Sequence, residues 1–109
     1  MKRLWLDDYR YPPPLWEDVV WVKTASEAIQ ALQETHFDVI SLDHDLGDDP
    51  EVGDGYEVLQ WMEEQVHLYG YRPPPQILIH SMNPVGHDRM KTAAEAILTA
   101  SKFSGTVNP

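Results

Sequence analysis

A short apolar run that leads directly into a cluster of ionisable residues is the strongest constraint on how this chain folds. Residues 39 to 42 read Val-Ile-Ser-Leu, and Asp43, His44 and Asp45 follow at once. Such a run predicts a buried strand. Ligands of open α/β proteins bind at the carboxyl ends of the strands, so we expect these three residues at a binding crevice.

Two further apolar runs also end in residues suited to acid, base or hydrogen-bonding chemistry. A parallel sheet would bring all three strand ends to one edge. The polar residues there would then form one active or binding site. The runs and the residues that follow them are 3–6 with Asp7 and Asp8, and 77–79 with His80, Ser81 and Asn83.

Between and after these runs the sequence predicts one more strand and three helices. Residues 19–22 are β-branched or aromatic, which is typical of a strand. The segment 24–27 fits a capping box for a helix of about ten residues, and the segment 54–57 resembles a second helix start. Asn83 followed by Pro84 fits the cap and first turn of a third helix.

Strands that alternate with helices imply a parallel sheet with right-handed crossovers. We expect one α/β domain over residues 1–109, with four strands in the order 2-1-3-4. Three consecutive prolines within residues 9–16 exclude a regular helix, so this segment is predicted to be a loop packed by its aromatic side chains. The tail, residues 104–109, is too short to assign an element.

The composition narrows the classes of partner. The formal net charge is −10, from 18 acidic residues against eight Lys and Arg, which disfavours binding to long nucleic acid through phosphate contacts. There is no cysteine, so disulfides and thiolate chemistry are excluded. No apolar run approaches the roughly 20 residues needed to span a bilayer, and a cytoplasmic protein without membrane contact is the expectation.

The acids at the strand ends predict a metal site. Asp7 or Asp8 together with Asp43 would supply the oxygen ligands that Mg²⁺ prefers, and Asp45 is a further candidate ligand. Adjacent residues of an extended chain point in different directions, so at most one of Asp7 and Asp8 is expected to touch the ion directly. The alternative is a solvated acidic rim. The acidic segment 43–54 does not match the calcium loop of an EF-hand.

Residues after the fourth apolar run, and two arginines, predict phosphate binding. A helix that starts at Asn83 would offer unpaired amides to an anion, and Ser81 would donate a hydrogen bond to it. Arg10 and Arg89 are candidates for binding the same anion. The alternative is that Arg89 only pairs with surface acids and that Asn83 only caps the helix.

Two histidines are candidates for proton transfer near neutral pH. His80 lies at a strand end, where the alternative is a histidine hydrogen-bonded to the backbone. His44 lies between two aspartates, but its side chain would face away from the site if the strand alternation continues. The spacing of residues shows no Ser-His-Asp triad, P-loop or dinucleotide-binding fingerprint.

The pattern resembles the receiver domains of two-component response regulators, with paired acids at Asp7 and Asp8, one acid at Asp43 and a hydroxyl at Ser81. This resemblance implies a receiver-like (flavodoxin-like) three-layer fold, here with four parallel strands, and Mg²⁺ beside an Asp43 phosphoacceptor. The proline-rich loop replaces the first receiver helix. No fifth strand follows, so the lysine that receivers place there has no counterpart.

The chain is more closely similar to the cyclic-phosphate-processing receiver-like family of bacteria and their phages. The strings that carry the similarity are Leu-Asp-Asp-Tyr-Arg-Tyr-Pro-Pro at 6–13, Ser-Leu-Asp-His-Asp-Leu-Gly at 41–47, Gly-Asp-Gly-Tyr at 53–56 and His-Ser-Met-Asn-Pro-Val-Gly at 80–86. Membership would imply action on cyclic phosphates, with a small phosphorylated nucleotide or an RNA terminus as the partner.

The function predicted from the sequence is metal-dependent hydrolysis of cyclic phosphates on nucleotides or RNA ends. In this hypothesis Mg²⁺ or another divalent cation is held by Asp43 with Asp7 or Asp8, and His44 or His80 moves the proton. Two alternatives stay open. One is a binding module, either an Asp43 phosphoacceptor or a non-catalytic sensor of a phosphorylated ligand; the other is an acidic interaction protein with a solvated rim.

Overall fold

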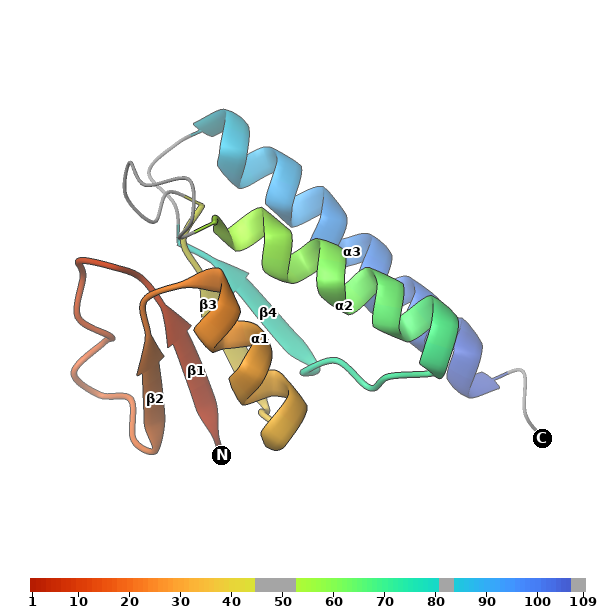
Figure 1. Ribbon diagram of the computed structural model, residues 1–109, viewed down its shortest axis with the longest axis horizontal. Helices are drawn as coiled ribbons and strands as arrows, with labels where there is room; N and C mark the ends of the chain where they lie inside the picture. The colour runs from red at the N-terminus through yellow and green to blue at the C-terminus, as the bar shows by residue number, and fades with distance from the viewer. Residues whose placement is uncertain (45–52, 81–83, 107–109) are drawn as a thin grey trace.

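The chain forms a four-stranded parallel sheet with helices packed on it (Figure 1). The computed structural model describes residues 1–44, 53–80 and 84–106. The strand order is β2-β1-β3-β4, and each neighbouring pair is parallel, so the predicted fold class and strand order are confirmed. The strands are β1 (Arg3–Leu6), β2 (Val19–Val22), β3 (Val39–Leu42) and β4 (Gln76–Ile79), and the helices within the described ranges are α1 (Ala25–Glu34), α2 (Gly55–Tyr69) and α3 (Pro84–Thr106).

Capping residues set the starts of the first two helices as the sequence predicted. The Thr24 side chain accepts a hydrogen bond from the Glu27 backbone N–H at the start of α1, and Asp54 does the same for α2. Gly70 ends α2 in the left-handed conformation, with φ of 65°.

The third helix is longer than the sequence indicated. It runs from Pro84 to Thr106 and so includes residues 104–106 of the tail, for which the sequence predicted no element. Asn83, the cap expected for this helix, lies outside the described residues. Across the ranges that the structure describes, no helix is both long and apolar enough to cross a membrane.

The three helices share one core with one face of the sheet. Alternate strand residues point to this face, and four of them, Leu4, Leu6, Ile40 and Leu42, have no exposed surface. Residues of all three helices belong to the same cluster. Burial of this apolar surface is the main term that stabilises the fold.

The opposite face of the sheet carries aromatic side chains that the proline-rich loop covers. Trp5 of β1 meets Trp16 of the loop edge to face, with ring centroids 5.7 Å apart. Trp21 of β2 meets Tyr11 in the same manner at 5.0 Å. On this side the layer over β1 and β2 is therefore the aromatic loop.

Close approach between β3 and α2 requires a glycine at the first residue of α2. The Gly55 N–H donates to the His44 carbonyl oxygen at 3.3 Å. A Cβ at this position would overlap the carbonyl oxygen of Asp43 and lie 2.7 Å from the Met90 methyl carbon. The helix start is thereby held directly against the residue that follows β3.

We predict that Gly55→Ala lowers the free energy of unfolding by about 1–3 kcal/mol, because α2 must move away from the end of β3 to make room for the methyl group. Urea denaturation measures the change. The control is Gly70→Asn, where nothing lies within 4 Å of the added Cβ and asparagine tolerates the left-handed conformation. Equal stability of Gly55→Ala and the wild type would contradict this packing.

Candidate functional site

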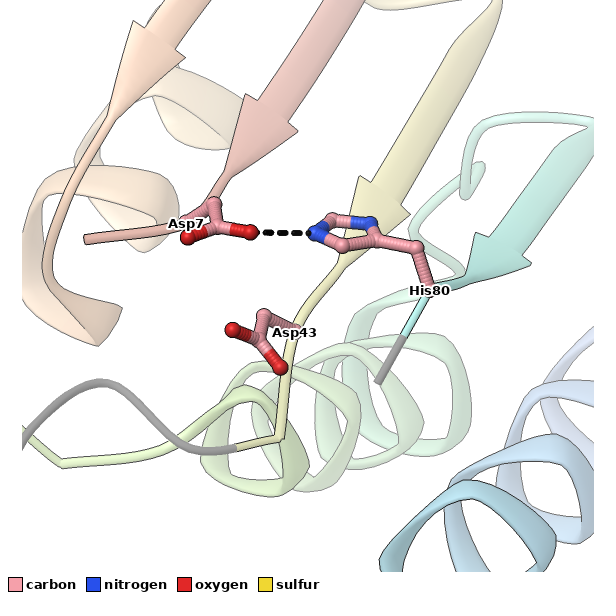
Figure 2. A group of neighbouring side chains, drawn as sticks. All are labelled: Asp7, Asp43 and His80. Atoms are coloured by element: carbon pink, nitrogen blue, oxygen red, sulfur yellow. Dashed lines mark hydrogen bonds and ion pairs between the residues drawn. The ribbon is translucent and has the colours of Figure 1, made fainter. Parts of the chain in front are cut away.

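Three ionisable side chains from three neighbouring strands meet at the carboxyl edge of the sheet (Figure 2). Leu6, Leu42 and Ile79 lie at the same level in the sheet. The residues that follow them are Asp7, Asp43 and His80. One ligand atom from each of these three lies within 4.8 Å of the others, which makes this the metal-ligand group within the described parts of the chain.

Asp7 is a buried carboxylate whose two oxygens have different partners. Its side chain is 1% exposed. The Oδ1 atom accepts hydrogen bonds from the backbone N–H groups of Tyr9 and Arg10, both at 2.8 Å. The Oδ2 atom lies 3.0 Å from His80 Nε2. One oxygen is therefore engaged by the loop, and the other faces His80.

The ring of His80 is held on three sides. Its Nδ1 lies 2.6 Å from the Ser41 hydroxyl oxygen, and its Nε2 faces Asp7. The ring also stacks on the indole of Trp5, with centroids 3.8 Å apart and planes within 5°. These contacts fix both the plane and the direction of the imidazole.

Burial lowers the pKa of His80 below its ordinary value of 6.5, although the hydrogen bond and the negative charge of Asp7 act in the opposite direction. A neutral imidazole donates from one nitrogen and accepts at the other. Asp7 accepts only, so the consistent arrangement has Nε2–H donating to Asp7 and the Ser41 hydroxyl donating to Nδ1.

The sequence places Ser41 in an apolar strand and does not indicate its contact with His80. It is 2% exposed, in a strand whose four residues are all buried. Ser41, His80 and Asp7 form a hydrogen-bonded chain, although no sequence spacing indicated one. Because Ser41 is buried, we assign it to orienting the imidazole and not to nucleophilic attack. The one sequence signal for this role is a single hydroxyl residue within an otherwise apolar strand.

The remaining acidic and histidine candidates are not members of this group or lie outside the described residues. Asp8 is exposed, so Asp7 is the member of the pair that joins Asp43 and His80. His44 is partly buried, and its ring lies against Gly86, where an added Cβ would come 2.7 Å from the His44 Cγ atom. Asp45 lies outside the described residues.

The candidate phosphate-binding residues are more dispersed. Arg10 is exposed, and its positive charge contributes to the low pKa of His80, so this charge acts at the site. Arg89 is exposed and its guanidinium lies over the ring of Tyr56, 4.2 Å from the centroid, which is a cation–π contact. Ser81 and Asn83 lie outside the described residues.

The donor set of the group fits a divalent cation. Two carboxylates and one imidazole nitrogen provide three ligand atoms close enough to share one ion. The Asp7 carboxylate is already oriented by two backbone N–H groups, the kind of supporting contact that metal ligands have in proteins.

Comparison with known proteins identifies a matching family and a similar solved structure. The family model for the cyclic-phosphate processing receiver domain matches residues 2–96, a range that includes Asp7, Asp43 and His80. Among solved structures, the signal receiver domain of a putative LuxO repressor protein from Vibrio parahaemolyticus is 21% identical, with 99% of this chain and 98% of that chain covered and a TM-score of 0.42. A search of curated proteins found no match.

The charge of Asp7 should be visible in the titration of His80. In metal-free protein we expect Asp7→Asn to lower the pKa of His80 further, because the Asp7 hydrogen bond and charge counteract the effect of burial. NMR titration of the imidazole signals measures this. Asp8→Asn, at the exposed neighbouring acid, is the matched control and should produce a smaller change. A pKa that rises in Asp7→Asn would contradict the contact.

The same shift gives stability a pH dependence. The unfolded chain binds the His80 proton more readily than the folded one does. We therefore expect the contribution of this group to the free energy of unfolding to fall as the pH drops below the ordinary pKa of 6.5. Urea denaturation of the wild type and His80→Asn across this range measures the contribution. A wild type whose stability falls no more steeply than that of His80→Asn would rule the contribution out.

Proposed function

The chain belongs to the cyclic-phosphate processing receiver domain family, and from this premise we propose that it hydrolyses cyclic phosphodiesters with the help of a divalent cation. The substrates would be cyclic phosphates on nucleotides or RNA ends. The observation that carries the proposal is the convergence of Asp7, Asp43 and His80 within 4.8 Å at the carboxyl edge of the sheet. This edge is where open α/β folds bind their ligands.

Asp7 and Asp43 are the residues that would hold the cation. The ion expected from the sequence is Mg²⁺. When bound, a divalent cation supplies positive charge that offsets the negative charge on phosphoryl oxygens. Asp7 is prepared for this role because its Oδ1 is held by backbone amides while Oδ2 faces the group. Asp43 enters from the neighbouring strand, with its backbone N–H bonded to the Leu6 carbonyl at 3.0 Å.

Other residues of the chain would bind the substrate and move the proton. Arg10 is exposed, and its charge acts on His80, so it is suited to a phosphoryl oxygen beside the group. The helix α3 begins at Pro84, and the anion contacts proposed for Ser81 and Asn83 come from the residues that precede it in the sequence. His44 and His80 are the candidates for proton transfer.

A second function is supported by the position of Asp43. It follows β3, beside the acid that follows β1, which is where a receiver domain has its phosphoacceptor. The family is described as a receiver domain as well as a cyclic-phosphate processing domain. The alternative proposal is therefore a module in which Asp43 accepts a phosphoryl group, or a site that binds a phosphorylated ligand without cleaving it.

Hydrolysis of 2′,3′-cyclic nucleotides, with and without a divalent cation, tests the enzyme. We expect cation-dependent turnover, reduced about a hundredfold or more in Asp43→Asn, since the loss of one ligand removes several kcal/mol of transition-state stabilisation. The matched control is Asp18→Asn, an exposed acid with φ of 53°, a conformation that asparagine adopts readily. Full turnover by Asp43→Asn would refute the proposal.

Treatment with acetyl phosphate separates the two functions. A phosphoryl adduct found by mass spectrometry in the wild type and absent in Asp43→Asn would support the phosphoacceptor. Cation-dependent binding of cyclic nucleotides without cleavage would support the sensor. Either result, together with no turnover of cyclic nucleotides, would lead us to abandon the hydrolase proposal.

A further inference from the structure

We propose that His80 is a ligand of the cation, through Nε2, and that the site therefore selects a transition-metal ion such as Zn²⁺ over Mg²⁺. Ser41 is assigned as the positioning residue that makes this ligation possible. The inference rests on the proposed function only in placing a cation beside Asp7 and Asp43.

The distances around His80 suit ligation. Its Nε2 lies 3.0 Å from Asp7 Oδ2. Two ligand atoms that each lie about 2.1 Å from one ion are about 3.0–3.4 Å apart when they subtend angles between a right angle and a tetrahedral angle. The separation that now accommodates a hydrogen bond therefore also accommodates two ligands of one ion. Because Asp7 Oδ1 is engaged by backbone N–H groups, Asp7 would bind the ion through Oδ2 alone.

Ser41 allows the proton of His80 to change its position. Ligation through Nε2 requires an unprotonated Nε2, so the proton of the neutral ring must lie on Nδ1. The Ser41 oxygen, 2.6 Å from Nδ1, then accepts this N–H. A hydroxyl serves equally as donor or acceptor, so it rotates and supports the ring both with and without the ion. An apolar residue at this buried position would leave the Nδ1 proton without a partner.

The ring of His80 is already directed toward Asp7. Trp5 stacks on its face, and the ring lies between Ser41 and Asp7. A side chain whose rotation is already restricted loses little conformational freedom when it binds an ion. This fixation suits a ligand better than a group that must turn towards a substrate, and it leaves His44 as the candidate for proton transfer.

The donor set explains the choice of ion. Mg²⁺ is a hard cation that takes oxygen ligands and retains several waters. Imidazole suits Zn²⁺ and other first-row transition metals, and carboxylates complete their coordination. Exchanging one oxygen ligand of a receiver-type site for the nitrogen of His80 moves the preference towards such ions.

Long-range ¹H–¹⁵N NMR of the ¹⁵N-labelled protein, titrated with Zn²⁺ and separately with Mg²⁺, tests the ligation directly. With Zn²⁺ we expect the Nε2 resonance of His80 to move to a metal-bound position and its proton to appear on Nδ1. With Mg²⁺ alone we expect the proton to stay on Nε2. Zn²⁺ binding at the site with His80 unchanged, or no Zn²⁺ binding at all, would overturn the proposal.

Binding affinities of variants test the roles of His80 and Ser41. Isothermal titration should show Zn²⁺ affinity reduced about 10- to 100-fold in Ser41→Ala and more strongly in His80→Asn, with Mg²⁺ affinity changed by less than about threefold. Ser26→Ala and His36→Gln remove an exposed hydroxyl and an exposed imidazole and are the matched controls. Equal losses for both ions would indicate a merely structural role and overturn the assignment.

These measurements are independent of the reaction. Zn²⁺ ligation by His80 without hydrolysis of any cyclic nucleotide would leave the inference intact and remove the proposed function. Hydrolysis supported by Mg²⁺, with no change at His80 on adding Zn²⁺, would do the reverse.

Discussion

The buried carboxylate of Asp7 is the interaction on which the site depends. One oxygen accepts from two backbone N–H groups of the proline-rich loop, and the other faces His80 after β4. A carboxylate that is 1% exposed is costly unless its oxygens are bonded, so the loop and the histidine must both be in place around it. Asp7 thereby ties the ends of β1 and β4 and the loop into one arrangement.

The proline-rich loop supports this arrangement from the face of the sheet that lies opposite the helices. Its residues cover Trp5 and Trp21, and the indole N–H groups of these tryptophans donate to the carbonyl oxygens of Arg10 and Asp7 at 2.8 and 2.7 Å. The loop therefore forms a packing layer on this face of the sheet and also shapes the site. The stack of His80 on Trp5 extends this aromatic layer to the ligand group.

The site also depends on how closely α2 approaches the sheet. Because Gly55 has no side chain, the helix begins against the backbone of Asp43 and His44. The registers of β1, β3 and β4 then place Asp7, Asp43 and His80 at one level. A fixed backbone with supported side chains is what a metal or phosphate site requires.

The sequence by itself determined the element types, the parallel sheet and the edge at which the polar residues gather, since these follow from hydrophobic periodicity, caps and crossover rules. The strand order 2-1-3-4 was also predicted, and the structure confirms it. The sequence left open whether Asp7 or Asp8 joins the group, and it missed Ser41 and Trp5 as partners of His80. Only the tertiary structure decided these points, because each depends on side-chain direction and on contacts such as the one between Ser41 and His80, 39 positions apart. Periodicity along a chain assigns a residue to a face of a strand; packing between strands decides which atoms on that face meet.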